Sequence, residues 1–112
     1  MERPVASPDA QQGYERIAEE LANSMGATPG KMMGMPTLYL AGKAFAGLFG
    51  DSMVFKLAGE AHAAALALPG AVLFDPSGMG RPMKAWVRVP LEQASSWPAL
   101  VEAAASGTGS AG

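Results

Sequence analysis

The chain has no cysteine and a single histidine, His62, among its 112 residues. The lack of cysteine excludes disulfide bonds and thiol chemistry, and one histidine leaves too few ligands for a typical zinc site. No apolar run is long enough to span a bilayer, and no basic segment followed by an apolar one opens the chain. We therefore expect a cytoplasmic protein that holds no metal or cofactor and has no membrane partner.

Charge is also scarce, since charged residues make up 16% of the chain and the net charge is −2. This balance argues against bulk attraction to nucleic acid or to anionic membranes, because both need a concentrated positive field. Basic residues nevertheless outnumber acids six to three between positions 31 and 88. They are Lys31, Lys43, Lys56, Arg81, Lys84 and Arg88, against Asp51, Glu60 and Asp75. The centre of the fold is therefore expected to be locally basic.

The hydrophobic pattern predicts one α+β domain over residues 1–105, followed by a disordered tail of glycine and serine over residues 106–112. Ser7 and Gly26 fit the start and the end of an amphipathic helix. Turn pairs at 41–42 and 50–51 divide residues 31–57 into a meander of three strands. Further elements are expected as a helix over 58–68, strands over 71–74 and 83–89, and a last helix over 91–105 with Pro98 early or breaking it in two.

This order leaves no room for the long crossovers of a parallel sheet, so the sheet should be largely antiparallel. The helices should then cover one face and leave the other open. Pro36 near the start of the meander is typical of an edge strand, where a missing amide is tolerated.

The segments 32–46 and 50–57 resemble the N-terminal domain of the TfoX/Sxy proteins. The shared pattern is a methionine and glycine before an aromatic strand, a Gly-Lys turn, an apolar strand and a last strand ending near lysine. Phe74, residues 83–86 and Val89-Pro90 are similar to the family's second half. The resemblance implies a two-layer sandwich of the secretion-chaperone-like kind, with five mostly antiparallel strands in the order 1-2-5-4-3. Longer TfoX proteins regulate natural competence through chains with a second C-terminal domain, so a competence role is not part of the expectation.

Catalytic motifs do not emerge from the residues, and we expect no enzyme. Residues 26–31 read G-x-x-x-G-K, which is one residue short of a phosphate-binding loop and follows a helix instead of a strand. Gly50-Asp51-Ser52 lacks the second glycine of a nucleophile elbow, and no second histidine serves a triad. His62 is expected to be an ordinary helix residue.

The strongest candidate site lies on the predicted open face of the sheet. Strand alternation sets Lys84, Trp86 and Arg88 against Ala85, Val87 and Val89. Such an aromatic and basic surface suits a base, a peptide or an acidic partner, whereas in the plainer interpretation lysine and arginine stems simply cover Trp86. The candidate binding residues are Tyr39, Lys43, Lys56, Arg81, Lys84, Trp86 and Arg88.

Two functional hypotheses remain, the first from the resemblance and the lack of catalytic motifs, and the second from the basic and aromatic surface of Lys43, Lys56, Lys84, Trp86 and Arg88. The first is a non-catalytic regulatory or protein-interaction module of the TfoX N-terminal type, with another protein or a second copy of the chain as its partner. The alternative is a small nucleic-acid-binding or anion-binding protein. Arg81 lies in the glycine-containing loop 75–82, which either binds an anion through its amides or is an ordinary solvated hairpin loop.

Overall fold

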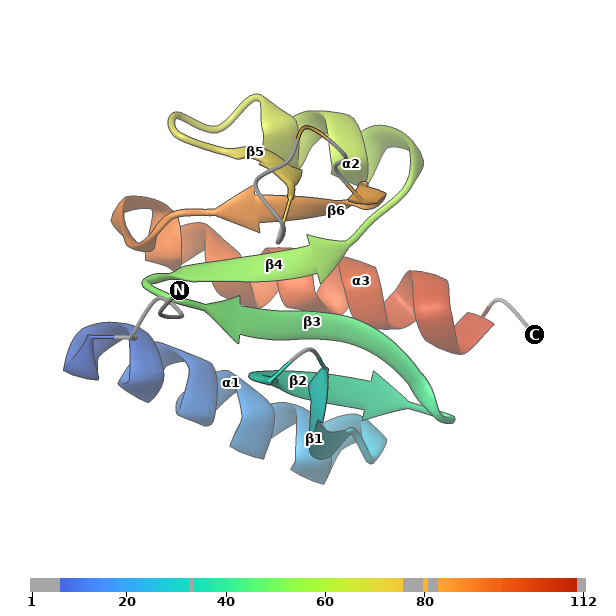
Figure 1. Cartoon of the computed structure of the whole chain (residues 1–112). Coiled ribbons are helices and arrows are strands. Elements are labelled where there is room, and N and C mark those ends of the chain that lie inside the picture. The colour runs from blue at the N-terminus through green and yellow to red at the C-terminus, as the bar shows by residue number, and fades with distance from the viewer. Residues whose placement is uncertain (1–6, 33, 76–79, 81–82, 111–112) are drawn as a thin grey trace.

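The computed structural model describes residues 7–32, 34–75, 80 and 83–110. Its helices are α1 (Pro8–Met25), α2 (Gly59–Leu66), the 3-10 helix η1 (Leu91–Ser96) and α3 (Trp97–Ser110). Its strands are β1 (Thr28–Met32), β2 (Met35–Leu40), β3 (Lys43–Phe49), β4 (Ser52–Lys56), β5 (Val72–Phe74) and β6 (Met83–Val89). Figure 1 shows the strands as one sheet, with α3 running behind it and α1 along its lower border.

The first helix begins and ends where the sequence predicts. The Ser7 hydroxyl accepts a hydrogen bond from the Ala10 amide at 3.2 Å, which satisfies one of the free donors of the first turn. Gly26 adopts a left-handed conformation with φ 73°, which glycine reaches without a steric penalty, and so ends the helix. The apolar stripe that faces the sheet consists of Ala10, Tyr14, Ile17 and Leu21.

The predicted meander is confirmed as β2, β3 and β4, which pair as consecutive antiparallel neighbours. Gly42 has φ 80° and Gly50 has φ 59°, so both turns use a backbone conformation that glycine favours. The apolar residues of the three strands then divide between the two faces of the sheet.

The order of the strands corrects two expectations. Within the described residues the sheet has six strands in the order β1-β2-β3-β4-β6-β5, with every neighbouring pair antiparallel. The expectation of five strands is therefore wrong, although the α+β class and the antiparallel sheet are confirmed. The five predicted strands correspond, in chain order, to β2, β3, β4, β5 and β6. Their expected order 1-2-5-4-3 is also wrong, because in the sheet they lie in the order 1-2-3-5-4. The short turn at 50–51 keeps β4 beside β3, and β6 then pairs with β4.

Strand β1 is the element that the sequence did not predict. Pro29 and Gly30 are both rare inside strands, so the pattern gave no strand signal there. Its pairing puts Lys31 opposite Pro36, so β2 lies inside the sheet and the edge position expected for Pro36 is wrong. The edge strand on this side of the sheet is β1 instead.

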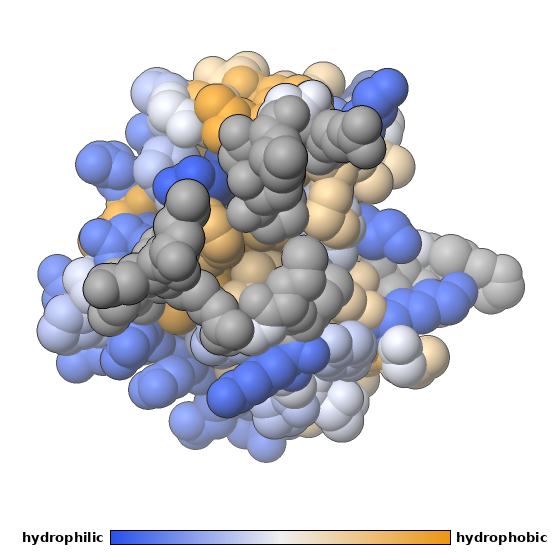
Figure 2. Space-filling model, viewed as in Figure 1, coloured by the Kyte–Doolittle hydropathy of each residue, from blue (hydrophilic) through white to orange (hydrophobic). Residues whose placement is uncertain are grey.

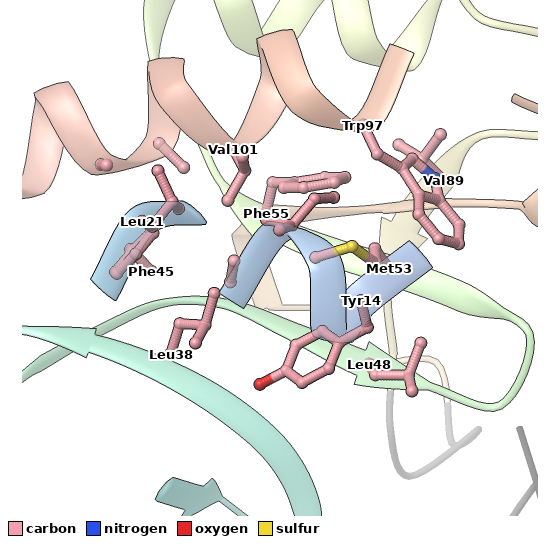
Figure 3. Close-up of a cluster of buried hydrophobic side chains, with 14 of the residues drawn as sticks. Tyr14, Leu21, Leu38, Phe45, Leu48, Met53, Phe55, Val89, Trp97 and Val101 are labelled. Atoms are coloured by element: carbon pink, nitrogen blue, oxygen red, sulfur yellow. The ribbon is translucent and has the colours of Figure 1, made fainter. Parts of the chain in front are cut away.

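The main core fills the space between the sheet and the helices. Figure 3 shows side chains of α1, α3 and the sheet pointing into this space. The ring of Trp97 packs against α1 at Gly13, where an added Cβ would lie 3.2 Å from a ring carbon. Ala65 of α2 is buried in the same cluster, so all three α-helices contribute to the layer on this face. The labelled members of the core are Tyr14, Leu21, Leu38, Phe45, Leu48, Met53, Phe55, Val89, Trp97 and Val101.

The last helical region is divided in two, as Pro98 predicted. Residues Leu91–Ser96 form η1, and Pro98 is the second residue of α3, where its missing amide breaks no helical hydrogen bond. The helix continues to Ser110, so its expected end at Ala105 is wrong. Ser106 and Gly107 are exposed, and an added Cβ at Gly107 would have nothing within 4 Å.

Candidate sheet-face binding site

The helix-free face of the sheet is built by strand alternation in β4 and β6. Phe55 and Val87 point into the main core, so their neighbours in sequence point the other way. The register pairs Val54 with Arg88 and Lys56 with Trp86. These four side chains therefore form a square in which the two cations occupy one diagonal and the two apolar residues the other.

A bulge in β3 shapes the same face. The pairing of β2 with β3 steps from Leu38↔Ala46 to Tyr39↔Ala44 and skips Phe45, so Phe45 and Ala46 both enter the main core. Gly47 then lies on the helix-free face, where an added Cβ would stand 2.8 Å from the Cε of Met35. The missing side chain at Gly47 thus makes room for Met35.

A second apolar cluster covers this face and corrects the exposure expected for Trp86. Trp86 is only 6% exposed, because it packs with Met35, Val54 and Phe74. Phe74 also meets the ring of Phe49 edge-on, with the centroids 5.0 Å apart. The sequence placed Trp86 on the correct face, but its indole belongs to a small core and offers no open ring for a ligand to stack on.

Arg88 is held at the border of this cluster by two contacts. Its Nε donates a hydrogen bond to the Ser52 hydroxyl at 3.3 Å, and Ser52 is itself 4% exposed. Its Cζ lies 5.3 Å from the ring centroid of Phe49, within the range of a cation–π interaction. The side chain is half-buried, and its two terminal Nη atoms have no hydrogen-bond partner in the described part of the chain.

Lys56 is exposed and forms no ion pair within the described residues. Lys84 is exposed too, but strand alternation does not fix its face. The pairing of β5 with β6 shifts between Leu73 and Phe74, and Met83 packs against the second cluster. The Lys84 carbonyl accepts a hydrogen bond at 2.7 Å from His62 Nε2, with the proton assigned to that nitrogen, which ties α2 to β6.

The other candidate residues do not join this cluster. The Tyr39 hydroxyl donates to the Lys31 carbonyl at 3.0 Å, and its ring lies over Gly30, so Tyr39 holds β1 in place. Lys43 is exposed beside the β2–β3 turn and precedes Ala44, which faces the second cluster, so Lys43 belongs to the opposite face. Arg81 lies outside the described residues.

Two residues that the sequence reasoning missed complete the environment of Arg88. The turn at 50–51 pairs Phe49 with Ser52, which puts both on the helix-free face, where both contact the Arg88 side chain. The sequence pattern could have identified both residues, because the strand alternation that assigned Arg88 to this face also applies to the two strands on either side of the turn. Neither was among the predicted site residues, all of which are basic or are aromatic with a polar group.

Two aspartates near the loops accept hydrogen bonds from backbone amides. Asp51 Oδ1 accepts a hydrogen bond from the Ser7 amide at 2.6 Å, and Asp75 Oδ2 accepts one from the Gly80 amide at 2.9 Å. Across the described ranges, no three His, Cys, Asp or Glu side chains gather as metal ligands. Nor does any helix in those ranges combine the length and the apolar character needed to cross a membrane.

Among the residues that the structure describes, two buried polar atoms of the main core have no hydrogen-bond partner, the Tyr14 hydroxyl and the Trp97 Nε1. Burial raises the pKa of the Tyr14 phenol above its ordinary value of about 10, and Tyr39 adds to the rise. Figure 3 shows the Tyr14 hydroxyl pointing away from α3.

Comparison of the chain with protein-family models, with curated proteins and with solved structures found no match.

Proposed function

We propose that the chain is a non-catalytic protein-interaction module whose helix-free sheet face binds an acidic segment of a partner protein. The observation that carries the proposal is the pair of cations Arg88 and Lys56 on this face. Neither has a carboxylate partner in the described part of the chain, and both flank the apolar pair Val54 and Trp86. A carboxylate of a partner could pair with each cation, and the half-buried Arg88 would gain most from a charge-assisted hydrogen bond.

The distribution of charge supports an acidic partner. The chain as a whole carries a net charge of −2, yet the exposed side of α1 holds Glu15, Glu19 and Glu20, in the helix layer on the other face of the sheet. Figure 2 shows hydrophilic residues gathered over the lower part of the molecule, where α1 lies. A partner with negative charge would be repelled by α1 and attracted to the helix-free face, which orients the encounter.

Nucleic acid is the less favoured occupant of this face. Sequence-tolerant binding of single strands relies on aromatic rings onto which bases stack, and Trp86 is 6% exposed. The buried indole therefore favours a partner that is held by charge and hydrogen bonds.

The resemblance to the TfoX/Sxy N-terminal domain stays part of the proposal. The β2–β4 meander supports it, although β1 intervenes between α1 and this meander, and the strand count and order differ from those that the resemblance implied. On this proposal the chain acts by binding another protein.

Fluorescence anisotropy with a labelled peptide in which Glu and Ala alternate tests the proposal. The double variant Lys56→Glu with Arg88→Glu should weaken binding about tenfold or more, because two attractions become repulsions. Lys43→Glu is the matched control, since Lys43 is exposed on the other face. Its effect should remain within about twofold, as for a distant charge screened by salt.

Three results would contradict the proposal. One is the absence of binding to the wild-type protein, and another is an equal loss in Lys43→Glu and in the double variant. The third is tighter binding of a single-stranded oligonucleotide with a steep dependence on salt, which would assign the face to nucleic acid.

A further inference from the structure

We propose that Arg88 anchors the partner by clamping one carboxylate end-on through its two Nη atoms. This inference rests on the proposed function and deepens it, because it names the group that the face recognises. It also separates Arg88 from the lysines, which supply charge without a fixed direction.

Two contacts fix the plane of the Arg88 guanidinium. The Nε–H lies in the guanidinium plane, so its hydrogen bond to Ser52 limits rotation about the end of the side chain. The Phe49 ring, whose centroid is 5.3 Å from Cζ, supports the group from one side, and its own orientation is held by the edge-on contact with Phe74. A group fixed in this way loses little conformational entropy when it binds a ligand.

The bond to Ser52 also selects the mode of binding. An arginine can hold a carboxylate side-on, through Nε and one Nη, or end-on, through both Nη atoms. Ser52 occupies Nε, so the end-on mode is the bidentate mode that remains. A carboxylate presents two oxygens in one plane, which matches the two coplanar Nη donors.

The environment of Arg88 also calls for a counter-charge from outside the described chain. The side chain is half-buried beside an apolar cluster, and its contacts are with a neutral hydroxyl and an aromatic ring. Asp51 is adjacent to Ser52 in sequence, but one of its carboxylate oxygens accepts the Ser7 amide at the start of α1. Partial burial removes part of the hydration of this cation, and a partner's Asp or Glu would offset that cost.

The test measures the affinity of the same Glu-Ala peptide for Arg88→Lys and Ser52→Ala. Arg88→Lys keeps the charge but replaces two directed donors by one ammonium, and the loss of one charge-assisted hydrogen bond predicts about tenfold weaker binding. Ser52→Ala keeps the whole arginine and removes only its support, so we expect a loss of about two- to fivefold. Arg16→Lys on the exposed side of α1 is the matched control and should leave affinity unchanged.

Chemical denaturation of each variant shows whether the fold is intact, and binding is compared only among folded variants. If Arg88→Lys binds within about twofold of the wild type while the double glutamate variant is weakened, the clamp is wrong and the charge-based function stands. If Arg88→Lys does not fold, Ser52→Ala decides alone, and unchanged affinity in that variant overturns the clamp. If the wild-type protein does not bind the peptide, both the proposed function and the carboxylate clamp are wrong.

Discussion

The two faces of the sheet are both apolar in their centres but are closed in different ways. On the helix-covered face, Phe55 is buried under α1 and α3. On the other face, its neighbour Val54 is equally buried, although the cover consists of side chains from the strands themselves, such as Phe74 and Trp86. A sheet face without helices is therefore not a solvated face. The groups on it that remain available to a partner are the cations at the border of the second apolar cluster.

The largest effect that tests this comparison is the loss of a large aromatic side chain from each face. Phe55→Ala and Trp86→Ala should each lower the free energy of unfolding by about 3–5 kcal/mol, because both remove a buried ring. Chemical denaturation measures both values. A loss below ~1 kcal/mol for Trp86→Ala would mean that its face is solvated and that the second cluster contributes nothing to stability.

The sequence predicted much of this arrangement, because it depends on local patterns. The Ser7 cap, the turns at 41–42 and 50–51, and the alternation of β6 each follow from residues that are neighbours in the chain. The face assigned to Arg88 and Trp86 was correct for the same reason.

The burial of Trp86 could not be predicted in that way. It depends on Phe74 and Met35 arriving on the same face from β5 and β2, which are distant in the chain. The bulge at Phe45 decides which residues of β3 face each side, and no pattern in the sequence marks it. Strand β1 escaped prediction because its pairing with β2 overrides the poor strand propensity of Pro29 and Gly30.

The packing of the helix-free face can also be tested by overfilling it. Gly47→Ala should cost about 1–3 kcal/mol, because the added Cβ would lie 2.8 Å from Met35 Cε and 2.9 Å from the Pro36 carbonyl oxygen. Gly107→Ala is the matched control: it lies in α3 with open space around it and should stabilise the protein by up to ~1 kcal/mol. Thermal denaturation compares the stability of the two variants. Equal stabilisation would show that the neighbours of Gly47 move to accommodate the added methyl group at little cost.

Within the described ranges, buried side-chain polar atoms without a hydrogen-bond partner occur only on the helix-covered face, and the Tyr14 hydroxyl is one of them. Tyr14→Phe should leave stability at neutral pH unchanged or raise it by up to ~1 kcal/mol. The pKa of Tyr14 is higher in the folded state than in the unfolded state, so folding favours the neutral phenol. The contribution of this preference to the free energy of unfolding is fully present below the unfolded-state pKa of about 10, and it is lost as the pH rises toward the folded-state pKa.

Urea denaturation at several alkaline pH values, compared between Tyr14→Phe and the wild type, measures this effect. The variant should lose less stability than the wild type above about pH 10. Identical pH profiles would mean that the phenol is not desolvated in the folded protein.

The smallest effect is expected at the end of α3, beyond both faces. Removal of residues 106–112 should leave the melting temperature within error, because Ser106 and Gly107, which follow the buried Ala105, are exposed. Differential scanning calorimetry of the truncated chain measures this, and a clear drop would show that this segment docks on the domain.

The two tryptophans provide the most direct test of the account, because the sheet separates them. Trp86 lies on the helix-free face between Lys56 and Arg88, whereas Trp97 is buried in the main core. Heteronuclear NMR of the isotope-labelled protein, with the indole signals assigned from Trp86→Phe and Trp97→Phe, follows both during titration with the Glu-Ala peptide. We predict that the Trp86 signal shifts and saturates while the Trp97 signal stays in place. Movement of Trp97 alone, or of neither signal, would contradict binding at the helix-free face.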